Sequence, residues 1–241
     1  MNLEEKRQYV KDNLQYVPLL DQEKYKENFV YGFIKNSSCI EGDYITLAQV
    51  IQIVNSAQRV VESNIQRSVY NNFVAYKMVE ERALKKEEIT EEFFKDVHEA
   101  LMKDISVGGL YRNVDIKIKG SEHIPCTYLK VYDRMGKFFY DINNFQGTDL
   151  ELVAYTHLQI AKVHPFLDGN GRIARLFMNY QLLKLGYLPI IINAKEREAY
   201  FDTMEQFKVN KTSQPFMDFL VDHLNKEYDK FIEYINHFKK N

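Results

Sequence analysis

The chain has 241 residues, a formal net charge of −2 and 45% hydrophobic residues, enough to bury a core as one domain or one domain plus an extension. Its near-neutral charge excludes the global basic field of a non-specific nucleic-acid binder. Only Cys39 and Cys126 are present, without disulfide or metal spacing, so a reducing cytoplasm is expected. Charged residues soon after Met1 and the lack of a long apolar run predict neither secretion nor membrane insertion.

Hydrophobic periodicity is mostly helical in the first part of the chain. Gly42 predicts the end of a helix over about 22–41. A capping box of Thr46 and Gln49 then opens an apolar pattern that continues to about Lys85 and indicates one long helix or a kinked pair. The apolar positions of this pattern include Val50, Ile53, Val54, Ala57, Val60, Val61, Ile65 and Val69.

The pattern changes after the next helix, which Thr90 is expected to cap and which should cover 91–103. Apolar and charged residues then alternate before Gly120, as in a short strand or hairpin arm. The alternating positions are Val114, Asp115, Ile116, Lys117, Ile118 and Lys119. This is the one convincing β signal in the sequence, so a single short β-hairpin is predicted.

Helical patterns return in the second half of the chain. Thr148 and Glu151 form another capping box, for a helix that ends at Val163 and delivers His164. The remaining helices are expected over 170–185, 196–209 and 215–238. Because no repeat or linker separates these segments, the expected fold is one all-α domain carrying one hairpin.

The densest group of reactive side chains is His164-Pro-Phe-Leu-Asp-Gly-Asn-Gly-Arg-Ile-Ala-Arg175. On a helix that begins after the glycine-rich turn, Arg172, Arg175 and Asn179 share one face. Free amides at the helix start and two guanidinium groups suit a polyphosphate. Asp168 suits a Mg²⁺ ion that also binds phosphate oxygens, and His164 can accept a proton. Each residue alone is commonly structural, but their coincidence predicts phosphoryl or nucleotidyl transfer.

This stretch resembles the signature of Fic-domain proteins, His-x-Phe-x-(Asp/Glu)-Gly-Asn-Gly-Arg-x-x-Arg, with every fixed position filled. Family-like context extends from about Leu110 to Tyr200. The resemblance implies a Fic-type helical bundle that transfers AMP from ATP, with Mg²⁺, to a Tyr, Thr or Ser hydroxyl of a target protein. It divides the single domain over 1–241 into three parts. These are an N-terminal region over 1–45 that contains an inhibitory helix, a catalytic core over 90–200 and a C-terminal helix over 215–238.

The resemblance also implies a role for each site residue. His164 would be the general base and Asp168 the Mg²⁺ ligand. The anion hole would consist of Asn170, Gly171 and Arg172, with Arg175 on the γ-phosphate and Asn179 as a nucleoside contact. The segment 114–124 resembles the family flap, which aligns an extended target segment by strand addition. The flap residues expected to meet the target are Val114, Ile116, Ile118, Gly120 and His123.

A second motif lies upstream, in Ser37-Ser-Cys-Ile-Glu41-Gly42. The Ser37 hydroxyl and the Glu41 carboxylate fall on one helical face. Taken alone, this arrangement is typical of a solvated charge at a helix end. The spacing also resembles the family's inhibitory motif, (Ser/Thr)-x-x-x-Glu-(Gly/Asn). That resemblance implies that Glu41 pairs with Arg175 and competes for the guanidinium that holds the γ-phosphate. An autoinhibited adenylyltransferase is therefore expected.

Two other functions fit the same sequence. A demodifying phosphodiesterase would use the same pocket, with Glu41 rather than His164 orienting the nucleophile, alone or alongside AMP transfer. A non-enzymatic interaction module would instead use the apolar face of 216–238 as a partner surface, unless that face simply packs on the domain. Neither nucleic acid nor a membrane is an expected partner. Self-modification, an oligomer and the identity of the target remain open.

The other histidines have no spacing typical of metal ligands. His157, seven residues before His164 on the same helix, is interpreted as a core residue or a support behind the site. His123 either touches the target backbone or belongs to a surface loop.

Overall fold

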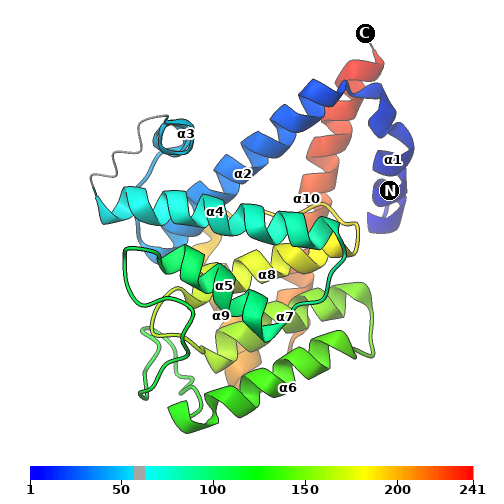
Figure 1. Ribbon diagram of the computed structural model, residues 1–241. Helices are drawn as coiled ribbons and strands as arrows, with labels where there is room; N and C mark the ends of the chain where they lie inside the picture. The colour runs from blue at the N-terminus through cyan, green and yellow to red at the C-terminus, as the bar shows by residue number, and fades with distance from the viewer. Residues whose placement is uncertain (57–62, 241) are drawn as a thin grey trace.

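The computed structural model describes residues 1–56 and 63–240, and within these ranges the chain is helical and contains no β-strand. Helices α7 and α8 run side by side through the middle of the molecule, and α2, α4 and α10 pack around them (Figure 1). The α-helices are α1 (Leu3–Asn13), α2 (Leu19–Glu41), α3 (Leu47–Asn55), α4 (Asn64–Leu84), α5 (Glu91–Met102), α6 (Val131–Asn143), α7 (Asp149–Val163), α8 (Asn170–Lys184), α9 (Arg197–Asn210) and α10 (Gln214–Lys239). Short 3-10 helices cover Leu14–Tyr16, Tyr128–Lys130 and Ala194–Glu196.

The helix ends follow the local signals in the sequence. Gly42 ends α2 in the left-handed region, with φ of 109°. Capping boxes begin α3 and α7, and the Thr90 side chain accepts from the amide of Phe93 to begin α5. These caps satisfy amides that no helix can satisfy internally.

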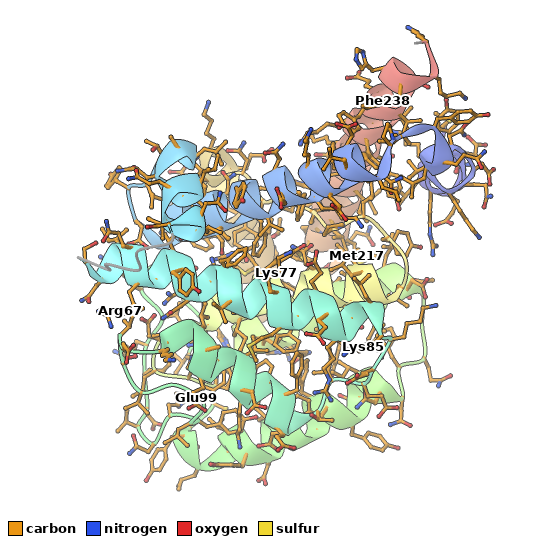
Figure 2. All side chains as sticks on the ribbon, turned by 45° about the horizontal axis from the view of Figure 1, so that its top comes forward. Arg67, Lys77, Lys85, Glu99, Met217 and Phe238 are labelled. Carbon is orange, nitrogen blue, oxygen red and sulfur yellow. The ribbon has the colours of Figure 1, made fainter. Side chains whose placement is uncertain are left out.

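The pattern predicted over 46–85 forms two separate helices, α3 and α4. A capping box of Ser63 and Gln66 begins α4. Of the apolar residues in the predicted pattern, Ala57, Val60 and Val61 lie outside the described residues. Figure 2 shows α4 with Arg67 and Lys77 labelled on it, and with α2 along one side and α5 along the other.

Two helices were not expected from the sequence. α1 has a capping box of Asn2 and Glu5, but only Lys6 and Val10 are buried on it. α6 has no side-chain cap, and its only strong signal is a buried stripe at three- and four-residue steps. The buried residues of that stripe are Val131, Met135, Phe138, Phe139 and Ile142.

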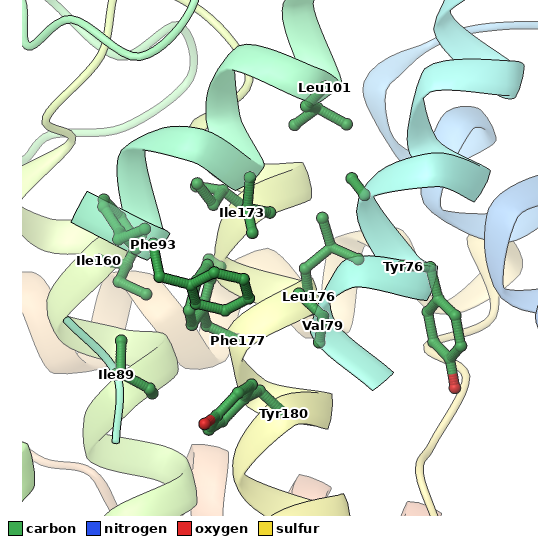
Figure 3. Packing of buried hydrophobic residues seen from close by; sticks show 14 of the residues in the cluster. Tyr76, Val79, Ile89, Phe93, Leu101, Ile160, Ile173, Leu176, Phe177 and Tyr180 are labelled. Atoms are coloured by element: carbon green, nitrogen blue, oxygen red, sulfur yellow. The ribbon is translucent and has the colours of Figure 1, made fainter. Parts of the chain in front are cut away.

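The hydrophobic core consists of two clusters that meet at α7 and α8. In the first cluster, Phe177 of α8 lies 5.9 Å from Phe93 of α5, ring centroid to ring centroid, with Val79 of α4 beyond them (Figure 3). The second cluster contains Met178 and Leu182 of α8 together with Leu220 and Leu224 of α10. Because α8 is buried on both sides, its start is held rigidly between the two clusters.

The apolar face of α10 is part of the second cluster. Leu220, Leu224 and Ile235 are fully buried there, and α10 packs on α1, with Tyr9 donating to Asn236 Oδ1 at 2.6 Å. The face therefore stabilises the fold and is not a free partner surface. No helix in the described ranges has the length and apolar content that a bilayer crossing requires.

Candidate active site

His164 lies at the junction of α7 and α8 in a strained backbone conformation. Its φ and ψ are 52° and 61°, in the left-handed region that costs a non-glycine residue roughly 1 kcal/mol. Its amide donates to the Ile160 carbonyl at 3.0 Å and closes α7. Strain of this kind persists where the surroundings hold it, and it is concentrated at functional sites.

Arg112 holds this turn from outside the motif. Although the residue is only 2% exposed, its Nε donates to the His164 carbonyl at 2.9 Å. Its Nη1 and Nη2 donate to the carbonyls of Val114 and Cys126 at 3.0 and 2.5 Å. The backbone amide of Arg112 also donates to Pro165, at 2.9 Å. Sequence analysis did not predict this role, because the His164 contact spans 52 residues.

The loop from Phe166 to Asp168 is fixed by two side chains. Asn170 accepts from the Phe166 amide at 2.9 Å and donates to its carbonyl at 2.8 Å. His98 stacks on Phe166 with ring centroids 3.5 Å apart. Its Nδ1 accepts from the Gly109 amide, so Nε2 carries the proton and donates to the Asp168 carbonyl, each at 3.0 Å. The side chain of Asn170 is thus a loop clamp, and its backbone amide is the group left for an anion.

The start of α8 has no side-chain cap. Gly169, with φ of 76°, offers no acceptor to the amides of residues 170–172, so these amides remain available to an anion at the positive end of the helix dipole. A Cβ on Gly171 would collide with the Glu41 carboxylate. Glu41 therefore lies directly over the helix start, where a negative group is stabilised.

The structure brings the upstream motif and Arg175 together. Arg175 is 1% exposed, and its Nε donates to Ser37 Oγ at 3.0 Å. Its Nη2 donates to the Ser37 carbonyl at 3.1 Å and to Glu41 Oε1 at 2.5 Å, across 134 residues of sequence. The remaining nitrogen, Nη1, is buried and makes no hydrogen bond. A buried guanidinium donor without an acceptor points to a missing ligand.

Arg172 and Asp168 form a second pair at the same helix start. Nη2 of Arg172 lies 3.3 Å from Asp168 Oδ2, and its Nη1 donates to Ser68 Oγ of α4 at 2.9 Å. The Asp168 side chain is 67% exposed. In the part of the chain that the structure describes, no group of three or more His, Cys, Asp or Glu residues could hold a metal ion. Asp168 fits a Mg²⁺ ion that takes its other ligands from phosphates and water.

His164 is neutral at physiological pH. Burial lowers its pKa to about 4, against the effect of a hydrogen bond to the Ala161 carbonyl, and the cations of Lys208 and Arg112 lower it further. With one ring nitrogen bound to a carbonyl, the other is free to accept a proton. Lys208 lies on α9 and was not expected near this site.

Asn179 has a structural role in place of the expected nucleoside contact. It is completely buried. Its Nδ2 donates to the Ile190 carbonyl at 3.0 Å, and its Oδ1 accepts from the Ile190 amide at 2.9 Å. Both ends of the side-chain amide are therefore used to fix the segment after α8.

The hairpin expected at 114–124 does not form, because the described residues pair differently. The amides of Glu122 and His123 donate to Glu205 Oε1 of α9 at 2.7 and 3.2 Å. Pro125 has no amide to donate. The residues after the Gly120 turn, 121–125, form the return arm, which therefore has few backbone donors left for a β-ladder. The segment is a loop with a turn at Gly120, where φ is 76°.

The expected flap residues differ in exposure. Val114 is 48% exposed, whereas Ile116 and Ile118 are half-buried. Nε2 of His123 contacts the Lys162 carbonyl at 3.0 Å. The side chain of His123 is thus fixed on α7.

His157 lies in the core behind the site, in agreement with one of its two interpretations. It is fully buried and its Nε2 lies 2.7 Å from the Tyr200 hydroxyl. The charge of the Arg175 guanidinium opposes the rise in pKa that burial causes at the Tyr200 hydroxyl. The pair of His157 and Tyr200 thus joins α7 to α9 in the core.

Comparison with known proteins agrees with this fold and motif. Residues 88–182 match the Fic/DOC family. A Fic-domain-containing signaling protein from Bacteroides thetaiotaomicron superposes with a TM-score of 0.84 at 21% identity, covering 98% of this chain and 96% of that one. Fic-1 from C. elegans gives a TM-score of 0.77 at 19% identity, covering 98% and 73%.

Curated relatives carry a functional name. The chain is 28% identical over 214 residues to "Protein adenylyltransferase Fic" of Drosophila grimshawi, covering 86% of this chain and 44% of that protein. The relative of the same name in Drosophila persimilis is also 28% identical, with 86% and 42% covered. The chain spans less than half the length of these relatives.

The helical scaffold, with its motif at the junction of α7 and α8, defines a Fic-type fold. The matched family segment contains the whole motif from His164 to Arg175. Over residues 88–182 the chain is thus similar to the Fic/DOC family.

Proposed function

We propose that this chain is a protein adenylyltransferase, which transfers AMP from ATP to a hydroxyl side chain of a target protein. The names of the curated relatives support this activity. The observation that carries it is the neutral His164 beside an uncapped helix start, with the two buried guanidinium groups of Arg172 and Arg175 on the same helix. A proton acceptor next to a polyphosphate site is what nucleotidyl transfer requires.

The nucleotide would bind by its phosphates at the start of α8. The amides of residues 170–172 and the Arg172 guanidinium suit the α- and β-phosphates. Arg175, with Nη1 free of any partner, suits the γ-phosphate. Asp168 would hold a Mg²⁺ ion, which neutralises phosphate charge when it is bound.

In the proposed reaction, His164 takes the proton of the target hydroxyl. The hydroxyl oxygen forms a bond to the α-phosphorus while the bond from that phosphorus to the bridging oxygen breaks. Pyrophosphate leaves with that oxygen, and AMP remains on the target. Arg112 keeps the imidazole in place because it binds the His164 carbonyl, so the base needs little reorganisation.

We further propose that Glu41 restrains this activity. Its carboxylate lies over the amides of α8 and binds Arg175 at 2.5 Å, where a phosphate oxygen would otherwise bind. Two negative groups cannot share these donors without repulsion. ATP would therefore bind weakly or with its α-phosphate out of line.

The base assignment is tested by changing His164→Ala in a Glu41→Gly background. Transfer of label from α-labelled ATP to proteins should be abolished, while a fluorescent ATP analogue should bind with unchanged affinity. The matched control is His237→Ala, an exposed histidine on α10, which should leave transfer intact. If transfer survives His164→Ala, another group accepts the proton.

A further inference from the structure

Glu205 of α9 binds three donors of the loop that follows the Gly120 turn. Its Oε2 accepts from Ser121 Oγ at 2.6 Å. Its Oε1 accepts from the amides of Glu122 and His123 at 2.7 and 3.2 Å. Charge-assisted bonds of this kind are stronger than neutral ones. Neither the Fic motif nor the proposed chemistry uses this carboxylate.

The same loop has a second anchor on α7. Nε2 of His123 donates to the Lys162 carbonyl at 3.0 Å, two residues before His164. The loop is therefore held on α9 by Glu205 and on the last turn of α7 by His123. Both anchors fix it relative to the imidazole.

The anchoring has a consequence for the arm before the turn. The amides of Glu122 and His123 donate to Glu205, and Pro125 has no amide hydrogen. Residues 122, 123 and 125 therefore have no backbone donor left to pair with residues 114–118. In the described chain the amides of residues 115–118 donate to no hydrogen bond. These amides are therefore free to pair with the backbone of an extended peptide by strand addition.

We propose that Glu205 is a positioning residue for target binding: it holds the return arm on α9 so that the arm over 114–118 stays unpaired beside His164. This inference rests on the proposed function, because it concerns alignment of the target hydroxyl. Without the anchor, the two arms can pair with each other or move away from the imidazole. Misplacement of a target by about 1 Å can reduce transfer about 100-fold.

Two substitutions at Glu205 separate anchoring from negative charge. Glu205→Ala removes the carboxylate that accepts from these three donors. Glu205→Gln keeps Oε1 for the two amides, and its new NH₂ group can donate to Ser121 Oγ, so it should rescue the anchor. Glu198→Ala, an exposed glutamate on the same helix, is the control.

The variants are made in the Glu41→Gly background and assayed with α-labelled ATP on lysate proteins. Glu205→Ala should lower transfer about 10- to 100-fold with unchanged affinity for a fluorescent ATP analogue. Glu205→Gln and Glu198→Ala should retain most of the transfer. Transfer by Glu205→Ala equal to that of its parent would overturn the inference.

Hydrogen exchange on the full chain tests the anchor independently of activity. The amide of Glu122 should lose protection in Glu205→Ala and keep it in Glu205→Gln, whereas the His123 amide also donates to Ser121 Oγ at 3.2 Å in the native loop and is less diagnostic. Unchanged protection in Glu205→Ala would contradict the anchor. If the Glu41→Gly parent transfers no label from ATP, the proposed function fails instead, and the exchange result still decides whether Glu205 holds the loop.

Discussion

His98 is hydrogen-bonded at both ring nitrogens in a way that only the neutral ring allows. Its Nδ1 accepts from the Gly109 amide while Nε2 donates to the Asp168 carbonyl. Burial lowers its pKa from 6.5 to about 4. Protonation would place an N–H opposite the Gly109 N–H and would loosen the turn that carries Asp168.

This pairing predicts a loss of stability in mild acid. The folded pKa lies below the unfolded value, so the unfolded chain takes up the proton first as pH falls. The free energy of unfolding should therefore decrease between about pH 6.5 and pH 4, by up to about 1.4 kcal/mol per pH unit for each such histidine. His157 and His164, whose pKa values are lowered to about 3 and about 4, add to the effect.

Urea unfolding of the wild type and of His98→Gln at pH 7, 6 and 5 measures this contribution. Glutamine can donate and accept but does not titrate in this range, so the variant should lose less stability between pH 7 and pH 5. An identical pH dependence in the two proteins would show that protonation of His98 does not destabilise the folded state.

At the level of the helices, the last turn of α2 determines where Glu41 lies. Gly42 ends this helix with φ of 109°, and no atom lies within 4 Å of an added Cβ. Arg197 of α9 donates to the Ile40 carbonyl at 2.7 Å and holds the same turn. The position of the carboxylate thus depends on backbone conformation as well as on its ion pair.

Gly42→Ala should loosen this turn through backbone strain alone. The change is expected to destabilise the fold by about 1 kcal/mol and to raise AMP transfer up to about fivefold, because a difference of that size shifts an equilibrium by this factor. Gly136→Ala is the matched control, since Gly136 lies inside α6 with free space around it. It should instead stabilise by about 0.5–1 kcal/mol. Reduced transfer by Gly42→Ala would contradict the proposed restraint.

Local signals predicted the helices better than the segments between them. Thr46, Thr148 and Gly42 act through contacts within a few residues, so the sequence alone locates the helix ends. Helix α6 has no such cap and was missed. Apolar and charged residues do alternate over 114–118, but a β-ladder also needs a partner strand. Glu205, more than 80 residues away in the sequence, accepts the hydrogen bonds that the return arm would otherwise donate.

At the level of the whole molecule, the site is assembled from distant parts of the chain. α2 supplies Glu41, α5 supplies His98 and the junction of α7 and α8 supplies the motif, with α8 fixed between two hydrophobic clusters. The sequence motif identified His164 and Arg175, and family resemblance supplied the pairing with Glu41. Arg112 and Glu205 could not be predicted, because their partners come together only when the helices pack.

Mass spectrometry can detect both AMP transfer by this site and the restraint of that transfer by Glu41. Wild type and Glu41→Gly are incubated with Mg²⁺ and ATP, GTP, CTP or UTP, alone and with cell lysate, and scanned for nucleotide adducts. AMP adducts from ATP are expected on Glu41→Gly itself or on lysate proteins, and several-fold fewer with the wild type. Equal labelling by the two proteins would contradict the restraint, and no AMP adduct from either would contradict the activity.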